Sequence, residues 1–328
     1  MSIDRLAQVI VTYNRPDLLR ELLDSIARVE PKPWRVIVVD NASTDGLTPG
    51  ILEEAAQTLP DGLLQVHHSP TNTGGSGGFS TGVDLAVKAG AKWIWLMDDD
   101  VEVLPGALDK LEPWTERFQL IQARRLDVNG QPFYWQARFN EFLGVPMPYS
   151  LNNFNGEGYV TINSGTFEGM LIAVDLVMRI GLPDPRFFIS WDDAVYAWVA
   201  SQYATCVYVD AFVLQKKRDQ KQISLGFRHF NDSPQLSKFY TMRNRGYVWR
   251  YFKEYGALNR FGFGLGTFLT FGKELLRLVA VEHSLKGLKP LLRGIWAAGK
   301  LRHDRQWRPM PPLADAQPSS AATNNQTK

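Results

Sequence analysis

Three adjacent aspartates, Asp98 to Asp100, follow directly after the apolar run 93–97. Adjacent carboxylates at the end of a buried strand repel one another, and a divalent cation is the usual compensation because hard cations prefer oxygen ligands. Alternate residues of an extended segment point the same way, so Asp98 and Asp100 can share one face. We expect Mn²⁺ or Mg²⁺ there, bridging a diphosphate as a nucleotide leaves. A solvated acidic turn is the alternative.

A second pair of carboxylates, Asp192 and Asp193, follows an aromatic segment that contains Phe187, Phe188 and Trp191. A transfer to a hydroxyl needs one base to take the proton, and a single carboxylate suffices. The aromatic side chains would give a sugar a stacking face and exclude water. The alternative is that Asp192 caps the helix that follows, with the aromatic residues in the core.

Two further segments fit a nucleotide ligand. Asp40 ends the apolar run 35–40, where its carboxylate could accept a hydrogen bond from a ribose hydroxyl or a base N–H; a turn or cap role is the alternative. The segment 72–79 has four glycines, which permit positive φ and a close approach of backbone to a diphosphate or sugar. No Gly-Lys-Ser/Thr follows, so it is not a Walker loop; a flexible turn before a helix is the alternative.

The elements that would position these residues alternate between strand and helix. Apolar runs predict buried strands at 8–13, 35–40, 63–67 and 93–97, with helices around 16–26 and 82–89 between them. This rhythm predicts an α/β fold with a mixed, mainly parallel, Rossmann-like sheet flanked by helices. Ligands gather at the carboxyl ends of such strands. Thr12, Asn14, Asp40 and the aspartate run all fall there.

Composition sets broader limits. The chain has 328 residues, 45% of them hydrophobic, which is ample for a large core. A net charge of +2 gives no indication of nucleic acid as a partner, and the lone Cys206 excludes an intrachain disulfide and fits a reducing compartment. Because no secretory signal and no spanning apolar stretch is evident, we expect a cytoplasmic protein, with contact to the inner face of the plasma membrane as an open alternative.

The segments Val38–Asp45 and Asn72–Phe79 and the motif Trp95–Asp100 resemble family-2 glycosyltransferases of the GT-A fold, over residues 7 to 215. The resemblance implies an inverting transfer from a nucleoside-diphosphate sugar. It implies a metal and diphosphate site at Asp98 and Asp100. The residues expected to bind the donor are Thr12, Asn14, Arg15, Asp40, Asn72, Gly74, Gly75, Asp98 and Asp99.

The pair Asp192-Asp193 resembles that of galactofuranosyl- and rhamnosyltransferase-like members, in which the second Asp is the base. Asp193 is therefore expected to be the base, with Asp192 orienting it or contacting the acceptor. Trp191 and Glu168 are expected to contact the acceptor as well, although an ion pair explains Glu168 equally well because a buried unpaired carboxylate is costly.

The sequence departs from these relatives at three positions. Val195 and Val199 stand where relatives often have an acid and an Arg, and Gln215 stands where many have a histidine metal ligand. Either the metal lacks that ligand, or His229 replaces it, or Lys216 and Lys217 supply positive charge to the diphosphate.

The C-terminal part reads as helical from about 236, with helices expected near 239–251, 265–281 and 285–301. Arg243-Asn244-Arg245 resembles a "YxxRN" segment of bacterial polysaccharide transferases, in which Arg could clamp phosphates; a basic pair on a helix surface is the alternative. The later helices mix apolar and basic residues, which fits an anionic membrane surface. Packing against the catalytic domain, or against a second subunit in a homo-oligomer, is the alternative.

We therefore expect a catalytic domain at 1–235, with a nucleotide-sugar half (1–100) and an acceptor half (101–235). A helical region at 236–310 and a disordered tail at 311–328 follow. The expected function is an inverting glycosyltransferase in bacterial polysaccharide or cell-envelope synthesis, acting on a glycan or lipid-linked glycan. UDP-galactofuranose is the first donor to consider and dTDP-rhamnose the next. The rivals are a nucleotidyltransferase, whose usual basic glycine-rich loop is replaced here by 12–16, and a degenerate, non-catalytic sugar-binding partner.

Overall fold

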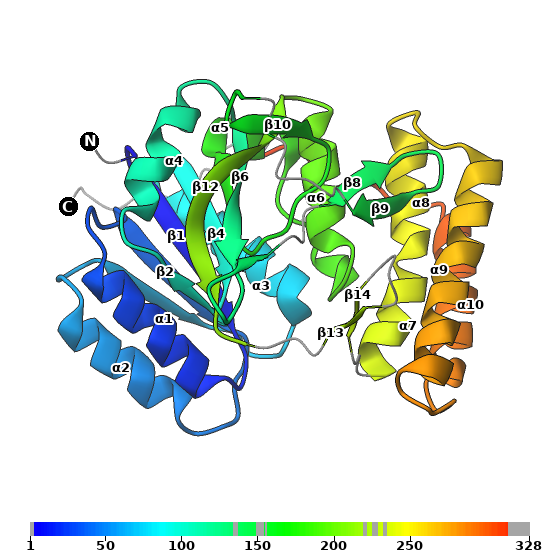
Figure 1. Ribbon diagram of the computed structural model, residues 1–328, viewed down its shortest axis with the longest axis horizontal. Helices are drawn as coiled ribbons and strands as arrows, with labels where there is room; N and C mark the ends of the chain where they lie inside the picture. Colours follow the sequence, from blue (N-terminus) through cyan, green and yellow to red (C-terminus); the bar gives the residue numbers. More distant parts are fainter. Residues whose placement is uncertain are drawn as a thin grey trace, which may run out of the picture.

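Four parallel strands form one half of a large sheet in the computed structural model (Figure 1). They are β1 (Leu6–Thr12), β2 (Arg35–Asp40), β3 (Leu64–His68) and β4 (Trp93–Asp98). The structure describes residues 3–133, 137–148, 154, 156–218, 222–224, 229–231 and 235–313. Within these residues the sheet has 10 strands, in the order β10-β12-β6-β11-β4-β1-β2-β3, with β5 and β7 paired to its members.

The other half of the sheet is mixed, because β11 runs antiparallel to both β4 and β6. Its strands are β5 (Val101–Val103), β6 (Leu120–Leu126), β7 (Pro132–Phe133), β10 (Tyr159–Ile162), β11 (Met170–Ala173) and β12 (Cys206–Lys216). Two small hairpins lie apart from it, β8 (Ala137–Asn140) with β9 (Val145–Pro148), and β13 (Gln222–Ser224) with β14 (His229–Asn231).

Helices cover both faces of the sheet because the strands are apolar on both sides. In β1, Val9 and Val11 belong to one core cluster and Leu6 and Ile10 to the other. The first cluster is covered by α3 (Gly74–Ala89), α5 (Val174–Ile180) and α6 (Asp192–Ser201), and the second by α1 (Pro16–Arg28), α2 (Thr48–Thr58) and α4 (Ala107–Thr115). The predicted fold class is confirmed.

The strand register brings the polar strand ends together. Thr12 lies opposite Asp40 across β1 and β2, and Val11 lies opposite Asp98 across β1 and β4. Three segments far apart in sequence therefore meet at one carboxyl edge, as the alternation of strands and helices predicts.

One local expectation was wrong. The glycine-rich segment is not a loop before a helix at 82–89 but the first turns of α3, which begins at Gly74. Only Gly74 has positive φ there, at 73°. The other glycines serve packing: a Cβ at Gly78 would lie 2.5 Å from Val11 Cγ1, and one at Gly82 would lie 2.3 Å from Val9 Cγ1. Because Gly78 and Gly82 have no side chain, α3 can lie close against β1.

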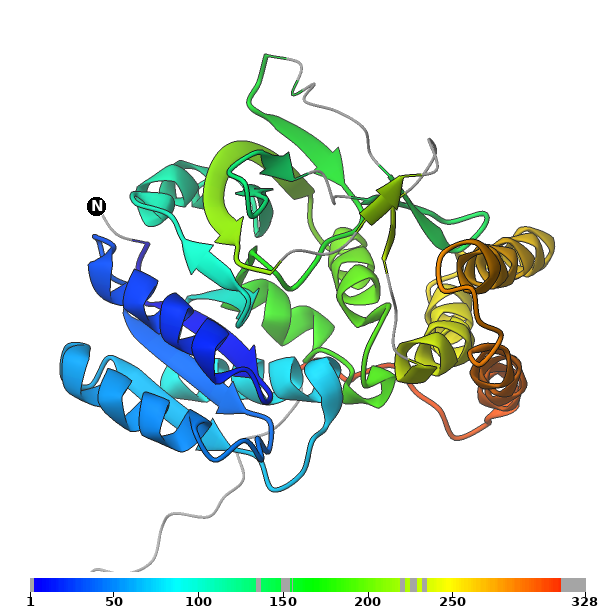
Figure 2. The same ribbon diagram turned by 60° about the horizontal axis from the view of Figure 1, so that its bottom comes forward.

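The C-terminal helices stand beside α6, at the end of the molecule away from β1–β3 (Figures 1 and 2). They are α7 (Gln235–Arg243), α8 (Arg245–Glu254), α9 (Arg260–Ala280) and α10 (Leu288–His303). The rings of Trp198 and Phe252, tilted against each other with centroids 4.4 Å apart, join α6 to α8. None of the described helices is long and apolar enough to cross a membrane. Residues 314–328, most of the tail expected to be disordered, lie outside the described residues.

Candidate active site

Three carboxylates converge at the carboxyl edge of the sheet. Each of Asp98, Asp100 and Glu168 offers an oxygen, and these oxygens lie within 4.8 Å of one another. Within the described part of the chain, the buried Oδ1 atom of Asp100 has no hydrogen-bond partner. Burial, and then the charges of Asp100 and Glu168, raise the pKa of Asp98 well above its usual value. A hard divalent cation fits this donor set, since it would relieve the repulsion and use the free oxygen.

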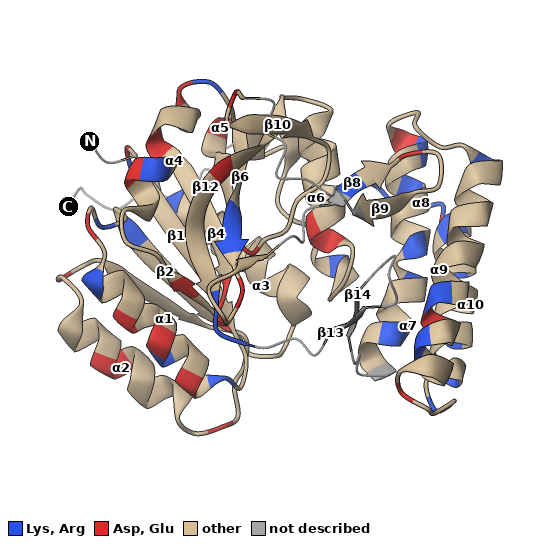
Figure 3. Ribbon diagram, viewed as in Figure 1, with Lys and Arg blue, Asp and Glu red and all other residues tan. Residues whose placement is uncertain are grey.

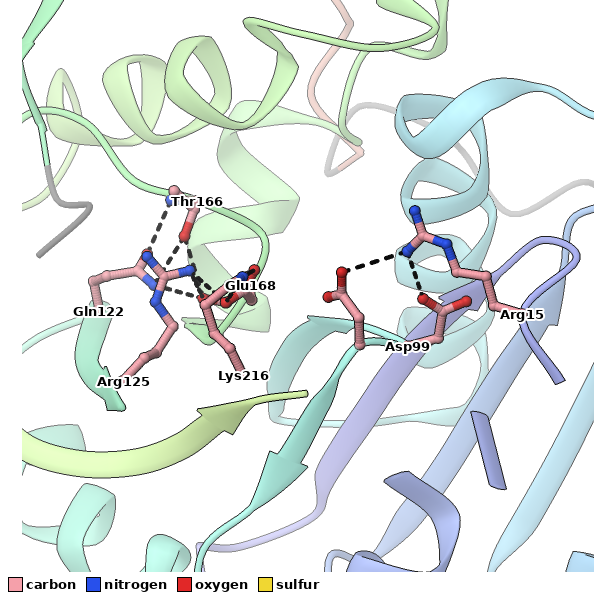
Figure 4. A network of polar contacts seen from close by, with 8 residues as sticks. Arg15, Asp99, Gln122, Arg125, Thr166, Glu168 and Lys216 are labelled. Carbon is pink, nitrogen blue, oxygen red and sulfur yellow. Dashed lines mark hydrogen bonds and ion pairs between the residues drawn. The ribbon is translucent and has the colours of Figure 1, made fainter. Parts of the chain in front are cut away.

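Glu168 is held on its other side by two buried cations. Its carboxylate lies 2.8 Å from Arg125 Nη1 and 2.8 Å from Lys216 Nζ (Figure 4). Although burial acts in the opposite direction, these two charges lower the pKa of Glu168. The ion-pair alternative for Glu168 is thus present in the structure, next to the aspartates; its expected contact with the acceptor stays a prediction.

Asp99, the middle residue of the run, points the other way. It accepts hydrogen bonds from Thr12 Oγ1 at 2.7 Å and from Arg15 Nη1 at 2.9 Å (Figure 4). The same Arg15 nitrogen lies 3.5 Å from Asp100. Alternation along the chain therefore divides the acidic run: Asp98 and Asp100 face Glu168, while Asp99 fixes the run to β1 and to the start of α1.

The predicted nucleotide-binding residues Asp40 and Asn14 both hold the loop that follows β2. Asp40 accepts from the backbone N–H of Ser43 at 3.0 Å and lies 3.0 Å from His68 Nδ1. Asn14, whose φ is 52°, accepts from the backbone N–H of Thr44 at 2.6 Å. The turn role that the sequence allows for Asp40 is therefore present. These bonds shape the rim of the sheet edge, and the role in nucleotide binding stays a prediction.

Asn72 organises the entry to α3. Its side-chain oxygen accepts from the backbone N–H of Gly74 at 2.8 Å and from Asn41 Nδ2 at 3.2 Å. Gly74 itself abuts the segment before α6, because a Cβ there would lie 2.0 Å from the carbonyl oxygen of Phe188. Gly75 has open space beside it, since no atom lies within 4 Å of a Cβ built there.

Asp192 and Asp193 form the first turn of α6. Asp192 accepts from Ser76 Oγ at 2.7 Å, which links it to α3. Burial first, and then the charge of Asp192, raise the pKa of Asp193 to about 7, while Arg125 acts in the opposite direction. A carboxylate with a pKa near neutrality suits a general base. Arg125 thus connects the Asp193 side electrostatically with the Glu168 side.

At the two positions where relatives often have an acidic residue and an arginine, this chain has valines that pack in the core. Val195 and Val199 are buried in α6. On β12, the residue that reaches the carboxylates is Lys216 and not Gln215, since neighbouring residues of a strand point to opposite faces. The side chain of His229, the suggested replacement ligand, lies outside the described residues.

Two contributors were missed in the sequence. Arg125 lies in the buried strand β6, and Ser76 in the glycine segment. The signal for Arg125 was a charged pair, Arg124-Arg125, inside an apolar strand, because a buried arginine requires an acidic partner. Nothing in the sequence marked Ser76 as the partner of Asp192.

Arg243, which could have clamped phosphates, instead donates hydrogen bonds to backbone carbonyl groups. Its Nη2 donates to the carbonyl oxygen of Phe187 at 2.9 Å and also to that of Arg186. Its Nε donates to Asn244 Oδ1 at 2.8 Å. The structure therefore uses this segment to hold the chain in front of α6.

Comparisons with known proteins agree with this geometry. The family model "Glycosyl transferase family 2" matches residues 8–175. The chain is 30% identical over 260 residues to galactofuranosyltransferase GlfT1 of Mycobacterium tuberculosis, covering 73% of this chain and 80% of that protein. It is 28% identical over 268 residues to GlfT1 of Mycolicibacterium smegmatis, covering 73% and 81%.

Solved structures share the fold at low identity. S. aureus TarS 1-349 superposes with a TM-score of 0.58 at 16% identity, covering 91% of this chain and 81% of that one. Mannosyltransferase PcManGT of Pyrobaculum calidifontis, solved with GDP-Man and Mn²⁺, gives 0.50 at 14% identity, covering 91% and 86%. These similarities establish the GT-A arrangement of the sheet and its helices.

Proposed function

This chain belongs to glycosyltransferase family 2, and on that premise we propose that it transfers galactofuranose from UDP-galactofuranose, with inversion, to a hydroxyl of a glycan or lipid-linked glycan. The product would belong to bacterial polysaccharide and cell-envelope synthesis. The similarity to GlfT1 along most of both chains supports this donor. The observation that carries the proposal is the two-part site, in which Arg125 links the carboxylate cluster to the half-buried Asp193, a carboxylate of raised pKa.

Asp98, Asp100 and Glu168 would hold a divalent cation, which supplies charge neutralisation for the departing diphosphate. Asp193 takes the proton of the acceptor hydroxyl. The acceptor oxygen then forms its bond to the anomeric carbon on the face opposite the diphosphate, and the old C–O bond breaks with its electron pair on the nucleoside diphosphate. Arg125 and Lys216 keep Glu168 ionised and oriented, while Arg15 fixes the acidic run through Asp99.

A donor screen tests this proposal. We expect UDP-galactofuranose to give the fastest nucleotide release among a panel with UDP-galactopyranose, UDP-glucose, dTDP-rhamnose and GDP-mannose, by about 10-fold or more. Release is measured with an octyl glycoside acceptor, and the D193N variant is the blank. A preference for dTDP-rhamnose would replace the donor assignment, and no release from any donor would favour the non-catalytic alternative.

We also propose that the C-terminal helices bring the enzyme to an anionic membrane surface. The face of α9 opposite its packed side is apolar and exposed; its residues are Phe261, Leu265, Phe268, Leu269, Leu276 and Val279. On α10, Lys289, Arg293 and Lys300 are exposed, and Lys300 Nζ lies 3.5 Å from the ring centroid of the exposed Trp296. Apolar residues beside cations and an exposed Trp are typical of helices that lie in a lipid interface.

The charge of this surface favours lipid over a second copy. The only acids between 260 and 303 are Glu274 and Glu282, and these pair with Lys273, Arg277 and Lys238. Figure 3 shows the resulting excess of Lys and Arg on the C-terminal helices. An isologous dimer through this face would bring like charges together, whereas an anionic headgroup layer complements them.

Vesicle flotation of the full chain checks this. We expect co-flotation with phosphatidylcholine vesicles that contain phosphatidylglycerol. F261S/F268S should lose at least about 10² in partitioning, because two exposed aromatic side chains that would enter the lipid are removed. L47S is the control, because Leu47 is exposed (61%) and lies at the N-terminus of α2, away from this surface. Equal partitioning of all three proteins contradicts the proposal, as does a wild-type dimer that F261S/F268S converts to a monomer.

A further inference from the structure

The chain in front of α6 adopts an unfavourable backbone conformation. Three non-glycine residues between η1 (Pro185–Phe187) and α6 have positive φ: Phe188 at 67°, Ser190 at 70° and Trp191 at 72°. L-residues rarely occupy this region, and such clusters persist only where the surrounding structure imposes them. The segment leads directly to Asp192 and Asp193, so whatever imposes its conformation also sets the position of both carboxylates.

Asn244 holds this segment in its positive-φ conformation, and it is fully buried between α7 and α8. Its Nδ2 lies within hydrogen-bond distance of three carbonyl oxygens of that segment, those of Phe187 (3.0 Å), Ile189 (2.8 Å) and Ser190 (2.9 Å). Arg243 Nε donates to Asn244 Oδ1 at 2.8 Å, which fixes the end of the amide that faces the carbonyls. One side chain thus gathers three carbonyl groups from four successive residues, 187–190.

Neighbouring residues of α7 hold the same segment by its side chains. Trp191 Nε1 donates to the carbonyl oxygen of Thr241 at 2.9 Å. The ring of Phe188 stacks on that of Tyr240, with centroids 4.8 Å apart. The end of α7 and its junction with α8 therefore contact both the backbone and the aromatic rings of the segment.

The opposite side of the segment rests on the donor half. The backbone N–H of Ser76 donates to the carbonyl oxygen of Phe188 at 3.2 Å, and Ser76 Oγ donates to Asp192. The glycine at 74 permits this approach, since a Cβ there would overlap Phe188. The segment is thus held between the start of α3 and the end of α7.

We propose that Asn244 is a positioning residue: it fixes the segment 187–191 so that the carboxylate of Asp193 faces the donor site. This rests on the proposed role of Asp193 as the base. It also makes the C-terminal helices part of the active site, because the contact that sets the base comes from the junction of α7 and α8. Asn244 touches no reacting atom and acts through the backbone that carries Asp193.

The variant N244D tests the positioning role of Asn244 with almost no change in side-chain volume. A carboxylate oxygen would replace the donating nitrogen and face three carbonyl oxygens, so the segment should be released. We expect kcat to fall about 10-fold, because displacement of a reacting group is costly, while the Kd for UDP stays within about 2-fold. Backbone hydrogen exchange should accelerate in 187–193 and not elsewhere. T270V is the control, because it removes a buried hydroxyl that donates to the carbonyl oxygen of Gly266 within α9.

Several outcomes would contradict the positioning role of Asn244. Wild-type kcat with unchanged exchange in 187–193 would do so, and so would equal losses of kcat, UDP affinity and exchange protection throughout the chain, which mark a merely structural role. If N244D does not fold, R243K tests the hold on the same segment, because it removes the Nε bond that orients the amide together with the Nη2 bonds to the carbonyl groups of Arg186 and Phe187. A fully active D193N enzyme defeats the base assignment alone, whereas unchanged exchange in N244D defeats the positioning role of Asn244 alone.

Discussion

Replacing Asp193 by Asn lowers kcat by at least about 10²-fold, since the loss of a general base costs that much or more. Asn keeps the size of the side chain and can keep the contact with the N–H of Ala194, which Asp193 Oδ1 accepts at 2.7 Å. Donor binding should therefore persist. The measurement is steady-state release of nucleotide together with calorimetric titration of UDP.

The same residue sets the pH dependence. Burial and Asp192 raise the pKa of Asp193 to about 7, so its basic form is present above that pH and is lost below it. We expect kcat/KM of the wild type to fall about 10-fold per pH unit on the acid side, and this limb to vanish from the residual activity of D193N. D175N, an exposed acid in the first turn of α5, is the control. Turnover of D193N within about threefold of wild type would contradict the assignment.

Removal of the metal should have an effect of similar size. A divalent cation would offset the repulsion among three carboxylates that lie within 4.8 Å of one another, and it would supply the charge that the departing diphosphate needs. We expect EDTA, or either substitution D98N or D100N, to lower turnover by about 10²-fold or more, since a metal supplies several kcal/mol of charge stabilisation. Mn²⁺ should restore the EDTA-treated enzyme and not the variants.

Direct binding separates a lost metal from lost catalysis. Titration of Mn²⁺ followed by electron paramagnetic resonance should show a bound ion in the wild type and a weakened one in D98N and D100N. E102Q is the matched control, because Glu102 lies two residues further along and forms surface ion pairs with Arg28 and Lys217. Full activity after EDTA treatment, with unchanged Mn²⁺ binding in D98N, would show that Lys216 and Arg125 supply the positive charge alone.

The sheet was predictable because its signal is local. Short, β-branched apolar runs such as 36–39 are typical of strands buried on both faces, and their alternation with helical spacing favours a parallel sheet. The glycine segment was misassigned because glycine weakens a helix in isolation. In this protein the close approach of α3 to β1 outweighs that preference, and the approach depends on Val9 and Val11, which lie some 70 residues earlier.

The amino-acid sequence by itself predicted the carboxylates that are proposed to carry the chemistry. It also determined that Thr12, Asp40 and Asp98 meet at one edge, because parallel strands bring their carboxyl ends together. Only the tertiary structure decided the partners of those carboxylates. Glu168 joins Asp98 and Asp100, Lys216 replaces Gln215 beside them, and Asn244 holds the segment before Asp193. The physical reason is that a buried charge or a strained turn is satisfied by whatever the fold brings near, and distance along the chain does not encode that.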